Sequence, residues 1–146
     1  MHHRNIAYLI ADSAGGRIVV WDRDMGAYHT LQTIHDGPDP ALSHRPPSPG
    51  FEKGAEPRRG MDDHDSVRKK VRAAFAAVLA EHVRQFASAH PVEGFILAAP
   101  TRLLGPLMAE LKSGPTILGS LAKDLTGTAD HDLGEWLIKA ELHTPA

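Results

Sequence analysis

Three segments near the start of the chain have the apolar pattern of β-strands. Residues 5–11 form an apolar run, residues 17–22 are rich in β-branched side chains, and residues 27–34 alternate between apolar and polar positions. The connections between them are short and rich in glycine and aspartate, which are turn residues. The pattern therefore predicts an antiparallel meander of three strands.

The strongest helical pattern covers residues 66–89, where apolar side chains recur every three or four positions. Asp65 or Ser66 is expected to cap the start of this helix, and Pro91 follows its end. The next segment, residues 93–98, is continuously apolar, which predicts a short strand buried on both faces.

The rest of the chain predicts two further helices and one more strand. A helix is expected over residues 101–112, with its regular part starting near Gly105 or with Pro106 confined to its first turn. Residues 115–122 are expected to form the fifth strand. Asp130 is expected to cap a last amphipathic helix.

This order of elements predicts one α/β domain that covers residues 1–146, with three layers and a five-stranded mixed sheet. Right-handed crossovers place the fourth strand parallel to the first and the fifth parallel to the fourth. The expected strand order is 3-2-1-4-5, the topology of ribonuclease H-like sheets.

A long segment at residues 35–63 breaks the pattern. It holds six of the 11 prolines and four of the 13 glycines, with few large apolar residues. It is therefore predicted to be one long Pro/Gly-rich loop, and loops of this length are uncommon and usually functional.

Composition narrows the class of protein. The 146 residues have a formal charge of −2 and include no cysteine, which excludes disulfides, thiolate metal sites and cysteine nucleophiles. No apolar run approaches the roughly 18 residues of a membrane span, and no signal peptide is evident. We expect a cytoplasmic protein with no membrane partner. Common nucleophile, nucleotide and dinucleotide motifs are also absent, so we expect no cofactor.

A candidate site lies at the carboxyl ends of the parallel strands, where ligands bind in open α/β sheets. Six residues from three segments are expected there: the candidate catalytic residues Asp12 and Asp124, and the candidate ligand-binding residues Ser13, Thr101, Arg102 and Lys123. Free backbone N–H groups near residues 102–104, with the Arg102 guanidinium, could hold a phosphate or carboxylate.

A purely structural interpretation of the same residues stays open. Asp12 then caps a turn, Arg102 and Asp124 form an ion pair, and Lys123 is solvated.

Metal ligation is not predicted. The sequence Asp-Asp-His-Asp at residues 62–65 has ligand chemistry, but acids before a helix also stabilise its N-terminus, and we favour that interpretation. Metal-dependent cleavage needs a cluster of carboxylates, and only Asp12 and Asp124 are expected together.

Charge is distributed unevenly along the chain. Eight of the 16 basic residues lie between positions 44 and 72, against five acids. Such a segment could contact RNA or another polyanion, or it could be an ordinary solvated surface. The candidate nucleic-acid-binding residues are Arg58, Arg59, Arg68, Lys69, Lys70 and Arg72.

Three short motifs together resemble those of a known family. They are Ala-Asp-Ser at residues 11–13 followed by Arg17, Ala-Ala-Pro-Thr-Arg-Leu-Leu-Gly at 98–105, and Lys-Asp-Leu-Thr at 123–126. The chain resembles the bacterial host attachment protein family, named for attachment to host cells. It departs from that pattern at Thr101, Leu103 and Met108, where proline, an aromatic residue and a basic residue are usual.

That family is in turn similar to the catalytic domain of archaeal and eukaryotic class 1 release factors. In those proteins a Gly-Gly-Gln loop precedes a long helix and promotes peptidyl-tRNA hydrolysis. The loop at 35–63 has the equivalent position, but the chain's Gly15-Gly16 is followed by Arg17, so no Gly-Gly-Gln is present. The resemblance implies a ribosome-directed ancestry without that chemistry.

Three functions are therefore weighed. We expect a non-catalytic binding module that contacts a ribosome or RNA through its basic segment. The alternative is a hydrolase of phosphoesters or peptidyl-tRNA at the carboxyl-end site, and the third is a homo-oligomer or partner-binding domain without nucleic acid.

Overall fold

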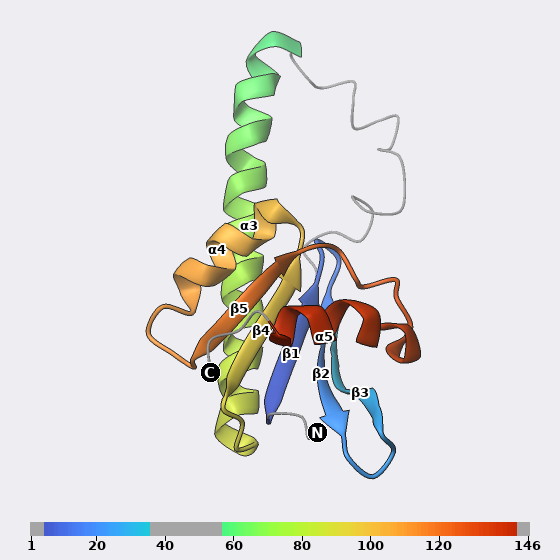
Figure 1. Cartoon of the computed structure of the whole chain (residues 1–146). Helices are drawn as coiled ribbons and strands as arrows, with labels where there is room; N and C mark the ends of the chain where they lie inside the picture. Colours follow the sequence, from blue (N-terminus) through green and yellow to red (C-terminus); the bar gives the residue numbers. More distant parts are fainter. Residues whose placement is uncertain (1–4, 36–56, 143–146) are drawn as a thin grey trace.

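The computed structural model describes the backbone of residues 5–35 and 57–142, and the side chains of residues 5–35 and 66–139. Most of the predicted loop, residues 36–56, lies outside the described residues. The elements, shown in Figure 1, are β1 (Ile6–Ala11), β2 (Gly16–Asp22), β3 (Ala27–Ile34), α3 (Pro57–Ala89), β4 (Gly94–Ala99), α4 (Thr101–Glu110), β5 (Ile117–Ala122), the short 3₁₀ helix η1 (Asp130–Asp132) and α5 (Gly134–Leu142).

The five strands form one mixed sheet in the predicted order β3-β2-β1-β4-β5. β1 pairs antiparallel with β2 and parallel with β4, and β4 pairs parallel with β5. Every residue of β1 and β4 is buried, as the continuous apolar run of β4 predicts. The predicted α/β class and strand order are confirmed.

The sheet separates two apolar cores. Alternate residues of β1 point to opposite faces, so that Leu9 belongs to one core and Tyr8 to the other. α3 and α4 cover the first face through residues such as Leu79 and Leu107. The segment from Leu125 through α5 covers the second face. The protein therefore has three layers, as predicted (Figure 1).

The long helix α3 differs from its prediction. It begins at Pro57 rather than at residue 66, so residues 57–63 are helical and the prediction that they belong to the loop is wrong. The predicted cap at Asp65 or Ser66 is wrong, because both residues lie inside the helix. The acids of residues 62–65 therefore do not precede a helix either. Local apolar periodicity did not reveal this first part of α3, because the first fully buried residue described in the helix is Phe75.

The start of α3 projects beyond the end of the sheet (Figure 1). Eighteen helical residues, 57–74, precede Phe75. At 1.5 Å per residue they extend the helix by about 27 Å. Residues 66–70 are all exposed, so this part of α3 has a surface with little packing against the rest of the described chain.

The expectation for Pro106 is also wrong. α4 runs from Thr101 to Glu110 without interruption and contains Pro106 in its second turn. Leu103 and Leu107 on either side are buried against the first core, which holds the helix in place despite the missing N–H group. In the described parts of the chain, no helix is both long and apolar enough to cross a membrane.

Candidate functional site

Asp12 closes the turn that follows β1. Its Oδ1 accepts hydrogen bonds from the backbone N–H groups of Ala14, at 2.8 Å, and Gly15, at 3.1 Å. This is the side-chain-to-backbone pattern by which aspartate stabilises turns. The turn interpretation of Asp12 is confirmed, and it leaves Oδ2 for a second contact.

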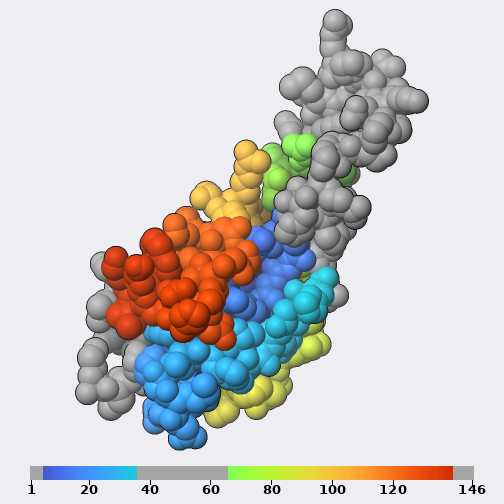
Figure 2. Space-filling model, turned by 90° about the vertical axis from the view of Figure 1, so that its right-hand side faces the viewer, coloured from blue at the N-terminus to red at the C-terminus, as the bar shows by residue number. Residues whose placement is uncertain are grey.

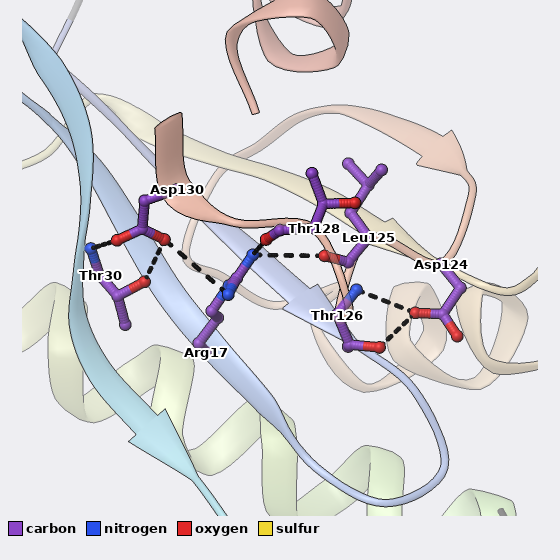
Figure 3. Close-up of polar contacts among 7 residues, drawn as sticks. All are labelled: Arg17, Thr30, Asp124, Leu125, Thr126, Thr128 and Asp130. Atoms are coloured by element: carbon purple, nitrogen blue, oxygen red, sulfur yellow. Dashed lines mark hydrogen bonds and ion pairs between the residues drawn. The ribbon is translucent and has the colours of Figure 1, made fainter. Parts of the chain in front are cut away.

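Thr126 brings Asp12 and Asp124 together. Its Oγ1 lies 2.9 Å from Asp12 Oδ2. The same Oγ1 contacts Asp124 Oδ1, which also accepts the Thr126 backbone N–H at 2.9 Å (Figure 3). A hydroxyl group has one proton, so Thr126 donates to one carboxylate at a time. The two candidate catalytic acids therefore face one neutral hydroxyl group.

Arg17 holds the same loop from the β2 side. Its Nη2 donates to the carbonyl oxygens of Leu125, at 3.3 Å, and Thr128, while Nη1 lies 3.8 Å from Asp130 Oδ1 (Figure 3). The side chain is 18 % exposed. The guanidinium thus gives the Leu125 carbonyl, which also accepts the Thr128 N–H at 3.0 Å, a second donor, and it ties the Thr128 carbonyl to β2.

Asp130 is a partner of strand β3 and not the predicted cap of the last helix. Its Oδ2 accepts the Thr30 backbone N–H at 3.0 Å, and its Oδ1 accepts the Thr30 hydroxyl at 2.7 Å. β3 is an edge strand, so this N–H would otherwise be open to a foreign strand. The residue before η1, Ala129, makes no side-chain cap, and α5 starts only at Gly134.

Lys123 lies on the α5 side of the sheet. Its Nζ is 4.2 Å from the ring centroid of Trp136, a cation–π contact. Leu125, two residues later, is 1 % exposed and belongs to the second core. The Lys-Asp-Leu-Thr segment therefore packs against α5 through Lys123 and Leu125 and against β1 through Thr126.

Thr101 and Arg102 lie at the start of α4, on the other layer. Both side chains are exposed. The expected free N–H groups are only partly present, because those of Leu103 and Leu104 both donate to the Pro100 carbonyl. Among the described residues Arg102 has no hydrogen bond or ion pair, so the structural pair expected between Arg102 and Asp124 does not form.

The six predicted site residues thus fall into two groups. Asp12, Ser13, Lys123 and Asp124 lie around the loop that packs on the α5 side, whereas Thr101 and Arg102 begin α4.

The basic segment is the second candidate site, the predicted surface for binding nucleic acid. Arg68, Lys69 and Lys70 are exposed on the projecting part of α3, and Arg72 is half-buried. Arg58 and Arg59 lie in the first turn of the helix, and their side chains are outside the described residues. The predicted nucleic-acid-binding residues are therefore carried by one helix rather than by a loop and a helix.

Sequence reasoning did not assign roles to Arg17, Thr30 and Thr126, and it assigned Asp130 a helix-capping role that the structure contradicts. Arg17 and Thr126 do stand in the motifs quoted above, so a signal existed for them. Thr30 and Asp130 are 100 residues apart, and no local pattern connects them.

A family described as "Protein required for attachment to host cells" matches residues 9–137, most of the chain. The chain belongs to this host attachment family. None of the curated proteins compared with the chain matches it. In this member of the host attachment family, two motifs far apart in the chain contact each other directly, because Thr126 binds Asp12 and Arg17 binds the Leu125 carbonyl.

Two hollows in the surface lie away from the predicted site residues. One, of about 230 Å³, is lined by five residues at the amino end of β1, namely Asn5, Ile6, Val20, Trp21 and Arg23. The other, of about 410 Å³, lies between the end of α4 and the start of β5. Within the described ranges no three His, Asp or Glu side chains gather in a group that could hold a metal ion.

Proposed function

We propose that this host attachment protein is a non-catalytic binding module that contacts RNA, free or within a ribosome, through the basic residues of α3. One observation carries the proposal. Four basic residues, Arg68, Lys69, Lys70 and Arg72, stand within five positions on a helix that projects from the body of the protein, and residues 66–70 are all exposed.

Electrostatics favours this segment over the rest of the surface. Residues 66–80 contain four basic residues and no acid, although the whole chain has a formal charge of −2. Three acids, Asp62, Asp63 and Asp65, precede the segment and limit the long-range field of α3. Binding should therefore depend on close phosphate contacts, which release counterions and are sensitive to salt.

The candidate acids support a binding role more than a catalytic one. Asp12 Oδ1 already accepts two backbone N–H groups, and Asp124 Oδ1 accepts one. A general base must be free to take a proton from its substrate. These carboxylates instead hold a turn and a loop in place.

The proposal is tested with two matched double variants. Arg68→Gln/Lys69→Gln removes two charges from α3, and Arg23→Gln/Lys112→Gln removes two from exposed positions elsewhere. We expect the α3 variant to lose roughly tenfold or more in affinity for RNA and to flatten the plot of log K against log salt by about 2. The control should bind as the wild type does. Fluorescence anisotropy with a labelled RNA over a salt series measures both.

Equal affinity for all three proteins would disprove the proposal, as would wild-type binding that does not change with salt. Circular dichroism checks that both variants are folded. The exposed positions of the substituted side chains make large losses of stability unexpected.

A hydrolase is the second candidate, because Asp12 and Asp124 face the same Thr126 hydroxyl at the carboxyl end of β1. It would act on a phosphoester or on peptidyl-tRNA. A hydrolase should lose turnover in Asp12→Asn or Asp124→Asn while staying folded. Absence of hydrolysis by the wild-type protein, with and without Mg²⁺, would remove this candidate.

A further inference from the structure

Three of the four basic residues continue the face of α3 that packs on the sheet. At 100° per residue, Arg72 and Lys69 lie about 40° and 100° around the helix from Arg68. The buried residues Phe75, Leu79, Val83 and Ala80 fall within the same arc, from about −20° to 120°. The packed face of α3 thus becomes a basic face where the helix passes the end of the sheet. Lys70 lies on the opposite side, about 200° from Arg68.

The start of α4 lies next to this basic face. Arg84 Nη2 of α3 donates to the Glu110 carbonyl at the end of α4, at 2.6 Å. Both helices run from the carboxyl ends of the strands toward their amino ends. Nine residues before Glu110 is Thr101, and nine residues before Arg84 is Phe75, so the start of α4 lies near Phe75 of α3. Arg72 is less than one turn further along α3. Figure 1 and Figure 2 both show the beginning of α4 beside α3.

Arg102 therefore extends the basic surface from one helix to two. It is exposed, and among the residues described it has no ion-pair partner. We call Arg68, Lys69, Lys70, Arg72 and Arg102 the basic corner. Lys123 is not part of it, because its ammonium group lies over Trp136 on the other side of the sheet.

Among the described residues, no exposed aromatic side chain accompanies the basic corner on which nucleic-acid bases could stack. In the side chains that the structure describes, each Phe, Tyr and Trp is buried or half-buried in one of the two cores. Proteins that bind single strands without sequence preference combine basic grooves with exposed aromatic rings on which bases stack. Recognition by the described residues would therefore rest on contacts between their charged groups and phosphates, which give position but no sequence information.

We infer that the basic corner binds the phosphate backbone of double-stranded RNA, without reading its sequence. This inference rests on the proposed function. The positive charges lie on two flanks of a projecting helix and on a second helix beside it. A duplex has two rows of phosphates, which can contact the basic residues on both flanks of α3 and on α4 at once. A single strand has one row of phosphates, which contacts one flank, and its bases find no aromatic ring among the described residues on which to stack.

The test compares an RNA duplex of about 16 base pairs with one of its own strands and with a duplex of different sequence. We expect the two duplexes to bind within about twofold of each other and the single strand to bind about fivefold more weakly. Arg102→Gln should weaken duplex binding about three- to tenfold and lower the salt slope by about 1. Arg102→Lys should restore most of the loss, and Arg23→Gln is the matched control.

The outcomes separate the two proposals. If the single strand binds as tightly as the duplex, or if Arg102→Gln behaves like Arg23→Gln, the inference is wrong while RNA binding by α3 stands. If neither RNA binds, the proposed function itself is wrong. If the two duplexes differ more than tenfold, the protein reads bases, and phosphate-only recognition is overturned.

Discussion

At the scale of single residues, the polar side chains of the family motifs hold the fold together. Thr126 links the loop after β5 to the turn after β1, and Arg17 binds two carbonyl groups of the same loop. The loop also forms backbone hydrogen bonds of its own, such as that from the Thr128 N–H to the Leu125 carbonyl, so these side chains add the contacts that fix it to the sheet. The contacts of Thr126 and Arg17 therefore give these motif residues a role in the fold that needs no ligand.

The Thr126 hydroxyl can be tested by itself. Thr126→Val removes the donor between Asp12 and Asp124 and leaves two carboxylates facing an apolar group. We expect the free energy of unfolding to fall by about 1 to 2 kcal/mol in urea titrations. Thr128→Val is the control, because Thr128 contacts Arg17 through its carbonyl oxygen, and it should change stability by less than about 0.5 kcal/mol. Equal losses in both variants would contradict the assigned role.

At the scale of elements, the two edges of the sheet differ. The β3 edge is covered in its middle by η1, whose Asp130 pairs with the Thr30 N–H. Edge strands with open N–H and C=O groups invite pairing with other chains, and carboxylates are one way to prevent it. Asp130 therefore both stabilises the fold and protects an edge.

Asp130→Ala should show both effects. The variant loses two hydrogen bonds to Thr30 and the ion pair with Arg17, and we expect about 1.5 to 3 kcal/mol less stability. It should also self-associate at concentrations where the wild-type protein does not, measured by sedimentation velocity. Asp132→Ala is the matched control, because that carboxylate faces only His131 and is 65 % exposed. If the two variants behave alike, the edge-capping role is refuted.

The elements themselves were largely predictable, and the failures have physical causes. β1 and β4 are fully buried, so their apolar runs reveal them, and crossover handedness then orders the sheet. The first nine residues of α3 were missed because apolar periodicity reports the packed part of a helix, and the first buried residue described in α3 is Phe75. Pro106 was misjudged because burial of Leu103 and Leu107 outweighs one missing hydrogen bond.

The site was less predictable than the fold. The expectation that strand ends gather polar residues placed Asp12 and Asp124 together correctly. It could not place Lys123 and Arg102 on opposite layers, because that depends on which face each following segment covers. It also could not find Asp130, whose partner is distant in sequence.

At the scale of the whole molecule, the two cores share the same central strands. β1 and β4 contribute alternate residues to both faces, so neither core can form without the other's strands. A protein of this size with such shared strands should unfold as one unit.

Cooperative unfolding of the two cores can be tested with two optical signals. Trp21 and Trp136 pack against the second core, so their fluorescence reports the α5 face. Far-UV circular dichroism is dominated by helix, and most of the helical residues belong to α3 and α4, the helices that cover the first face. We expect both signals to give the same midpoint in urea. Midpoints that differ by more than the experimental error would show that the two layers unfold separately.

Arg17 and its partner Asp130 are made at different times during synthesis of the chain. Its partner Asp130 follows it by 113 residues, so at roughly 5–20 residues per second a ribosome adds it about 6 to 23 seconds later. During that interval the strands β2 and β3 have been made, but the carboxylate that covers the β3 edge and pairs with Arg17 has not. The growing chain therefore passes through a stage in which this edge is open to other strands, and the synthesis of η1 ends that stage.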